Sequence, residues 1–419
     1  MASEVNPESG SPVYSEGKEP YQLRYRWVML ALIWILYVVF GVILRSISPL
    51  ITPIMADLNI SYSQMGLVLG AWPLTYVAVA VVGGTVIDKL GIRKSLFAGI
   101  IIIGLSEALR YYANSFGLMF LCVALIGFGG PMISIGAPKL IAVWFRGKNR
   151  GTAAGVYMTG PWIGGLVAYA LTNSVVMPFT GYSWRLTFVV YSLLAFAAAL
   201  LWWFLARDAK STEAAKSTSL AKVFSGLIRI RNVQLLIIIG FLSFAIVHGF
   251  NDWLPKILET NGLSPELAGF VASLSVAVGI PAVLIVSHVS PPHLRGRVIA
   301  LLSVVTAITI PAVVILSDAP MIVSIALYGA ATCAIIPLPL LLLMETPEVG
   351  SRYMGSAGGM FFCVAEIGGF VGPLIIGILV DMTGSFLAGT SILAVMSLVT
   401  GAIALSVKTQ PVSRPEASP

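Results

Sequence analysis

Charged residues are scarce in this sequence. Asp, Glu, Lys and Arg make up only 10% of its 419 residues, whereas a soluble domain carries about 25%, so a soluble protein is not expected. There are three cysteines and three histidines, and no group of them has the spacing of a metal site or of a disulfide framework. The Gly-rich loop ending in Lys-Ser/Thr that holds ATP phosphates is also missing. We therefore expect no metal, no cofactor and no ATP hydrolysis.

Long apolar segments, in contrast, are abundant. Apolar residues make up 58% of the chain, and a helix of about 20 such residues crosses a bilayer core about 30 Å thick. The fold class is therefore predicted as an all-α integral membrane protein with twelve transmembrane helices in two six-helix bundles. The predicted spans are 25–50, 63–87, 95–114, 117–145, 150–175, 183–206, 233–255, 264–287, 296–316, 319–344, 351–380 and 384–407.

The polar segments between the spans predict the domain boundaries and the orientation. With the N-terminus inside, 20 of the 25 Lys and Arg residues lie on the inner side and only Arg185 and Lys256 on the outer side, which is the bias of cytoplasmic loops. We expect a multi-pass protein of the plasma (inner) membrane with both termini cytoplasmic. The predicted parts are a disordered tail (1–24), an N-terminal bundle (25–206), a central loop (207–232), a C-terminal bundle (233–407) and a tail (408–419).

A short motif separates the second and third spans. It reads Gly84-x-x-x-Asp88-Lys89-x-Gly91-x-Arg93-Lys94. The glycines permit a close turn, Asp88 is placed to accept hydrogen bonds from a neighbouring helix N-terminus, and the cations face the anionic leaflet. This pattern, together with the six-plus-six spans, resembles the major facilitator superfamily of secondary transporters. The resemblance implies a central site reached alternately from each side by rocking of the two bundles.

Two narrower resemblances compete. The segments Leu44–Ile51 and Asp57–Ser61, with Glu107–Arg110, are similar to the cyanate-porter and nitroimidazole-transporter family, except that Ser46 stands where those porters usually have proline. The segment Gly136–Phe145 is similar to the feline leukaemia virus subgroup C receptor family, whose members are linked to haem and choline. That family lacks an arginine like Arg45, which favours the first resemblance and an anionic solute.

Charges inside the spans are candidate functional residues, because placing them in a membrane is costly. The planar guanidinium of Arg45 suits a carboxylate or cyanate, although an arginine there can also extend to the headgroups. Lys139 is expected either to attract an anion from the cytoplasm or to reach the headgroups. Glu366, in mid-span, is either a proton carrier or a static partner for an arginine. Matched Gly/Pro breaks in the fifth and eleventh spans favour a central site or, equally, close helix packing. The predicted substrate-binding residues are Arg45, Lys139, Tyr157, Trp162 and Glu366.

A second group of residues is predicted to act in gating or coupling. His248 and Asp252 are four residues apart, so they share a helix face. We expect them either to form a gate or a proton relay, or simply to lie at the end of the span that is exposed to water. Arg110 follows Glu107 by three residues, which favours a structural ion pair over ligand contact. The predicted gating and coupling residues are Asp88, Arg93, Arg110, His248, Asp252 and Glu366.

The function that these residues favour is transport rather than catalysis. An enzyme would need a catalytic constellation, and only His248 has plausible partners; a receptor would be expected to carry an appended soluble domain. We expect a monomeric secondary active transporter of a small anion, monocarboxylate-like or cyanate-like, with protons as possible co-substrate. The alternative is a carrier of a cationic or neutral organic solute. No nucleic-acid partner is expected, because the basic residues lie in loops between spans.

Overall fold

The computed structural model describes residues 20–208 and 225–408, without the side chains of 20–23, 81–85, 88, 148 and 350–352. Every regular element in these residues is helical. The N-terminal half consists of α1 (Pro20–Arg45), α2 (Ile51–Leu58), α3 (Tyr62–Leu90), α4 (Ile92–Leu109), α5 (Phe116–Ala124), α6 (Ile126–Trp144), α7 (Lys148–Leu171), α8 (Met177–Phe179) and α9 (Trp184–Leu205). The C-terminal half consists of α11 (Arg231–Thr260), α12 (Pro265–Val289), α13 (Arg295–Ile315), α14 (Asp318–Ile335), α15 (Pro337–Met344), α16 (Gly350–Thr383) and α17 (Phe386–Leu405).

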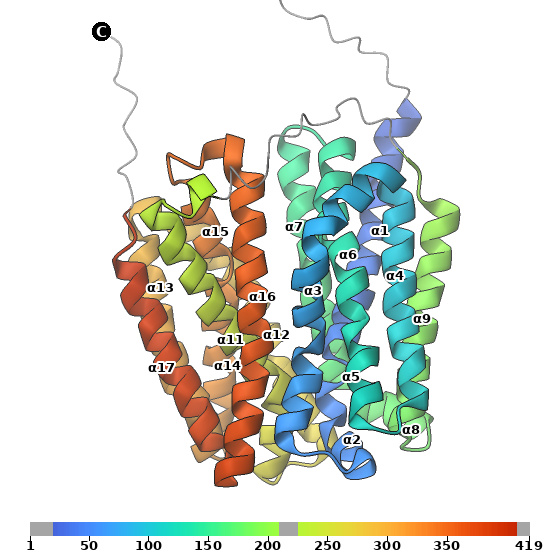
Figure 1. Ribbon diagram of the computed structural model, residues 1–419, viewed down its shortest axis with the longest axis vertical. Coiled ribbons are helices and arrows are strands. Elements are labelled where there is room, and N and C mark those ends of the chain that lie inside the picture. The colour runs from blue at the N-terminus through green and yellow to red at the C-terminus, as the bar shows by residue number, and fades with distance from the viewer. Residues whose placement is uncertain (1–19, 209–224, 409–419) are drawn as a thin grey trace, which may run out of the picture.

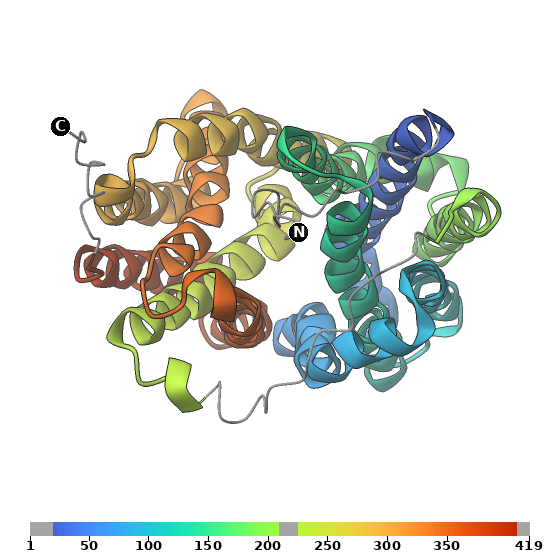
Figure 2. The same ribbon diagram turned by 90° about the horizontal axis from the view of Figure 1, so that it is seen from above.

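The two halves stand side by side with their helices roughly parallel (Figures 1 and 2). Helices α3 and α7 of the N-terminal half contact α16 and α12 of the C-terminal half. We call the end where α2 lies the lower end and the end where α1 begins and α17 ends the upper end, as drawn in Figure 1.

The prediction of an all-α membrane protein with twelve transmembrane helices is confirmed. Eleven helical segments in the described part are both long and apolar enough to cross a bilayer. The twelfth, α4, has 18 residues and carries Arg93, Lys94 and Glu107, which raises its polarity. It packs between α6 and α9, and protein neighbours therefore cover a helix that lipid alone would not accommodate.

Two predicted spans are interrupted at equivalent places in the halves. The fourth span breaks at Leu125 between α5 and α6, and the tenth breaks at Ile336 between α14 and α15. The first span also ends earlier than predicted: α1 stops at Arg45, and a 3₁₀ turn at Ser48–Leu50 leads into α2. Proline at residue 49 is consistent with this stop, because it has no N–H to donate to the carbonyl oxygen of Arg45, four residues earlier, and its ring clashes with that carbonyl in an α-helix.

Gly164 of the fifth span and Gly368 of the eleventh span serve close helix packing within each half. A Cβ on Gly164 of α7 would lie 2.1 Å from the carbonyl oxygen of Val38 in α1. A Cβ on Gly368 of α16 would lie 2.0 Å from the carbonyl oxygen of Phe241 in α11. The backbones of α1 with α7, and of α11 with α16, approach so closely that only glycine fits.

We expect Gly164→Ala to destabilise the protein by about 1–3 kcal/mol, because the new methyl group forces α1 and α7 apart. Gly155→Ala in the same helix is the matched control, since a Cβ there meets no atom of the described residues within 4 Å and alanine favours helix by up to about 1 kcal/mol. Thermal denaturation of the purified protein measures both. Equal melting temperatures for the two variants would contradict the close approach.

Candidate functional site

An ion pair joins the two halves near the lower end. Arg45, the last residue of α1, contacts the carboxylate of Asp252 in α11 through its Nη1. The side chain of Asp252 is 5% exposed and that of Arg45 is 18% exposed. Arg45 and Asp252 are 207 residues apart in the chain. Each of these charges would be costly to bury without the other.

Two further titratable side chains gather around this ion pair. Nδ1 of His248, one turn before Asp252 in α11, lies 3.9 Å from Oδ2 of Asp252. Glu366 of α16 is buried, and a Cβ on Gly369 would lie 3.1 Å from its Oε2 and 3.2 Å from Cδ2 of His248. Glycine at 369 therefore leaves room for a carboxylate and an imidazole to meet between α11 and α16.

Aromatic rings line the side of the cluster that faces the N-terminal half. The ring of Trp72 in α3 lies 5.5 Å from that of His248, and Tyr76 lies one turn further along α3. Phe244 contacts both His248 and Phe362. Trp72 thus reaches across from one half to the other beside the charged residues.

Three buried polar atoms of the cluster have no hydrogen-bond partner among the described residues. They are Oε2 of Glu366, Nδ1 of His248 and Oδ1 of Asn251. Buried polar atoms without partners are rare in proteins and mark places where water or a solute binds. The site therefore offers one cation, two carboxylates, an imidazole and an amide oxygen to whatever enters it.

The halves are tied together at the lower end by hydrogen bonds that cross between them. Asp381 of α16 accepts from the backbone N–H of Tyr62 at 3.0 Å and of Ser63 at 2.7 Å, where α3 begins. Asn173 of the N-terminal half donates to the carbonyl oxygen of Pro265 in the C-terminal half at 3.1 Å. It also donates to the carbonyl oxygen of Pro49, within its own half, at 3.0 Å. The bonds that cross between the halves close the lower end.

Toward the upper end, the ribbons of the two halves are farther apart than at the lower end (Figure 1). A Cβ on Gly151 or Gly155 of α7, or on Gly355 or Gly359 of α16, would meet no atom of the described residues within 4 Å. The hydrogen bonds between halves named above all lie at the lower end.

The other predicted substrate residues lie along α6 and α7. Lys139 is half-buried near the upper end of α6, whereas Arg45 lies at the lower end of α1. The ring of Tyr157 packs against that of Tyr37 at 5.1 Å. Trp162 packs against the main hydrophobic core and lies one turn before Gly165, where a Cβ would be 3.3 Å from Cγ of Arg45. The structure thus brings together Arg45, His248, Asp252 and Glu366.

Arg110 forms the ion pair with Glu107 that the spacing predicts. Its Nη1 lies 2.7 Å from Oε1 of Glu107, and both side chains are almost fully buried. Nη1 also donates to the hydroxyl of Ser46 at 3.3 Å, and the guanidinium carbon lies 4.8 Å from the ring centroid of Phe188. All these contacts lie within the N-terminal half, which favours the structural interpretation over gating.

The motif after α3 also makes its described contacts within one half. Nη2 of Arg93 donates to the carbonyl oxygen of Trp203 at 2.5 Å, and its guanidinium lies 5.2 Å from the Trp203 ring centroid. These contacts join α4 to α9. The side chain of Asp88 lies outside the described residues, so its predicted gating role stays a prediction.

Sequence reasoning missed Asp381, Asn173 and Tyr169. Tyr169 Oη donates to the carbonyl oxygen of Asn251 at 2.8 Å, beside the ion pair. The sequence contains a local signal only for the start of α3, which is where Asp381 binds. Ser61 and Gln64 form the capping box that begins this helix, and the spacing of a capping box can be recognised in a sequence. Nothing local indicates that a carboxylate from residue 381 completes that cap.

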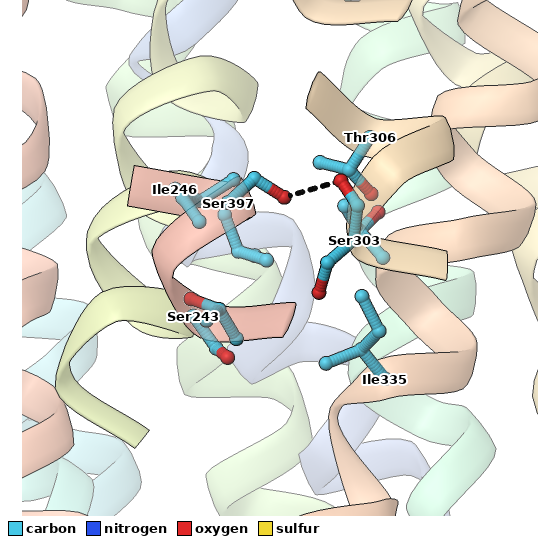
Figure 3. Close-up of a pocket in the computed structure, with 9 residues that line it drawn as sticks. Ser243, Ile246, Ser303, Thr306, Ile335 and Ser397 are labelled. Atoms are coloured by element: carbon cyan, nitrogen blue, oxygen red, sulfur yellow. Dashed lines mark hydrogen bonds between the residues drawn. The ribbon is translucent and has the colours of Figure 1, made fainter. Parts of the chain in front are cut away.

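A small pocket inside the C-terminal half was also not predicted. It lies between α11, α13, α14 and α17, and Ser397 donates to the carbonyl oxygen of Ser303 at 2.8 Å across it (Figure 3). All nine lining residues belong to the C-terminal half, so this pocket is not the site between the halves.

Comparison with known proteins identifies the class. The sequence model of the Major Facilitator Superfamily matches residues 33–373, and the chain belongs to this family of membrane transporters. Among solved structures, a nucleoside transporter superimposes with a TM-score of 0.76 at 17% identity, covering 91% of this chain and 99% of that one. A bacterial homologue of the lysosomal transporter Spinster has a TM-score of 0.73 at 15% identity, covering 93% and 97%. At these identities the structures show the fold alone.

Curated relatives carry more specific names. The hexuronate transporter of Bacillus subtilis is 25% identical over 81% of this chain and 84% of its own. The "probable sulfoacetate transporter" of Cupriavidus necator is 23% identical over 87% of this chain and 90% of its own. These relatives do not support the narrower resemblance to cyanate porters and nitroimidazole transporters.

Proposed function

We propose that this protein is a secondary active transporter of a small organic anion that carries a carboxylate, and that it works by alternating access. The single observation behind this proposal is the partly buried guanidinium of Arg45, whose Nη1 already contacts the carboxylate of Asp252 at the boundary between the halves. A planar guanidinium that pairs with one carboxylate is chemically suited to another. The names of the relatives, which describe transport of sugar acids and a sulfonated acid, support an anionic solute.

The arrangement of contacts supports alternating access. Hydrogen bonds between the halves lie at the lower end, and the ribbons of the halves are farther apart at the upper end (Figure 1). In this proposal the upper end and both termini are cytoplasmic in the plasma membrane, as the distribution of Lys and Arg indicates. The described conformation is then open to the cytoplasm and closed to the outside.

Each candidate residue has a proposed role in this cycle. Arg45 binds the carboxylate of the solute, and Lys139, near the cytoplasmic end of α6, attracts the anion into the opening. Tyr157 and Trp162 lie along α7 between its upper end and Gly165, which is next to Arg45. Glu366 acts in gating as a buried carboxyl group whose Oε2 has no hydrogen-bond partner among the described residues.

A second candidate is a carrier of an organic cation or neutral solute. The observation that favours it is the aromatic group of Trp72, Phe244 and Phe362 beside Glu366. Aromatic faces with a carboxylate are suited to a quaternary ammonium group. Arg45 weighs against this candidate, since a fixed positive charge repels a cation.

Proteoliposome uptake distinguishes the two candidates. We expect saturable uptake of radiolabelled D-glucuronate, inhibited by galactarate or sulfoacetate and unaffected by choline, with cyanate included as the smallest test anion. Empty liposomes are the control for leakage. Saturable choline uptake that none of the anions inhibits would reject the anion transporter and favour the second candidate.

A further inference from the structure

The charges around Arg45 do not balance if every group is ionised. The titratable groups around the Arg45–Asp252 pair are Tyr169 of α7, His248 of α11, Tyr328 and Cys333 of α14, and Glu366 of α16. This set contains one permanent cation and two carboxylates. Because buried charges are stable only when compensated, the empty site is balanced when Asp252 is ionised against Arg45 and Glu366 is protonated.

Binding of an anion upsets this balance. Nη1 of Arg45 already contacts Oδ1 of Asp252, and an incoming carboxylate that binds the guanidinium through two parallel hydrogen bonds from Nη1 and Nη2 requires this same nitrogen. When the solute takes this position, Asp252 is left 5% exposed and without its cation. A second negative charge in the same buried space is disfavoured by like-charge repulsion as well as by burial.

We infer that Asp252 is an internal competitor of the transported anion for Arg45, and that it takes up a proton when the anion displaces it. This inference rests on the proposed function. The step is balanced: a proton from solution adds to a carboxylate oxygen of Asp252, the ion pair ends, and Arg45 pairs with the anion. The net charge of the site is the same before and after, so one proton accompanies each monovalent anion and transport is electroneutral.

The surroundings of Asp252 fit this exchange. Nδ1 of His248 lies 3.9 Å from Oδ2 of Asp252 and has no hydrogen-bond partner among the described residues. It is placed to pass a proton or to hydrogen-bond the neutral acid. Asp252 and Arg45 also belong to different halves, so protonation of Asp252 removes one of the ties that close the lower end.

The first test uses the empty transporter and needs no substrate. Spin labels are attached to Ala56→Cys in α2 and Leu267→Cys in α12, both of which are exposed at the lower end. Pulsed electron paramagnetic resonance then measures the distance between the two labels, which increases when the lower end opens. Cys122 and Cys333 are buried, and the less buried Cys363 is replaced by serine. We expect closure at about pH 7.5 and a larger open population at about pH 5, because carboxyl groups take up protons over this range.

Asp252→Asn is expected to increase the open population at both pH values and to remove its pH dependence. Asp57→Asn is the matched control: it removes the ion pair of Asp57 with Arg185, also near the lower end but within one half, and we expect the parent behaviour. If Asp252→Asn stays as closed as the parent and opens with the same pH dependence, Asp252 is not the competing group.

The second test measures coupling in proteoliposomes with radiolabelled D-glucuronate and a pH-sensitive dye. We expect about one proton per anion and no response to an imposed membrane potential in the wild type. In Asp252→Asn, the proton flux is lost and the remaining uptake becomes sensitive to potential. If instead Glu366→Gln uncouples uptake and Asp252→Asn does not, Glu366 carries the proton and the inference is wrong. Absence of anion uptake in the wild type would reject the proposed function, while the spin-label test would still decide the role of Asp252.

Discussion

Arg45→Ala is expected to abolish uptake of carboxylate anions. Removing one partner from a buried, charge-assisted pair costs about 2–5 kcal/mol, which corresponds to a fall in affinity of roughly 30- to 4,000-fold. The same substitution leaves Asp252 buried without its cation, so the protein is expected to be less stable as well. Uptake of radiolabelled D-glucuronate at a range of concentrations measures the loss.

Three further variants separate binding from folding. Arg45→Lys keeps the charge but loses the planar fork, so we expect partial uptake with weaker affinity. Arg45→Ala with Asp252→Asn removes both charges; we expect it to regain stability but not uptake. Arg185→Ala removes an arginine that pairs with Asp57, 30% and 44% exposed, and should transport normally. Normal anion uptake by Arg45→Ala would contradict the proposed function.

Arg110→Met is expected to destabilise the protein by about 3–5 kcal/mol, because Glu107 would remain buried without a compensating charge. The exposed fractions of the two side chains are 1% and 0%. Thermal denaturation in detergent measures the change. Replacing both partners, as in Glu107→Leu with Arg110→Met, is expected to cost much less, because the lone buried charge is then gone.

The surface pair of Asp57 and Arg185 provides the control for this second prediction. Arg185→Met should change stability by about 0–1 kcal/mol, as is usual for exposed ion pairs. If Arg110→Met were as harmless as Arg185→Met, the Glu107–Arg110 pair would not stabilise the N-terminal half. Loss of uptake without loss of stability would instead indicate the gating role first considered for Arg110.

The pairs predicted from sequence are those within one helix. Glu107 with Arg110 and His248 with Asp252 are three and four residues apart, and the structure brings each pair together. The periodicity of the helix alone places such residues on one face. The fold class and the number of spans were predictable for a similar reason, since bilayer thickness sets helix length.

The pairs that define the site join distant parts of the chain. Arg45 and Asp252 are 207 residues apart, Tyr62 and Asp381 are 319 apart, and Trp72 contacts His248. Which of these residues meet depends on how the two bundles dock and on which end of the molecule is closed. Lys139 carries a positive charge as Arg45 does, but α6 places it near the upper end of the molecule.

The sequence by itself therefore determined that this protein is a helical membrane protein, because hydrophobic segment length is a property of single helices. The resemblance of its Gly84–Lys94 motif indicated the transporter family. The tertiary structure decided which charges act together. A buried charge is stable only beside its partner, and the partner of Arg45 comes from the other half of the molecule.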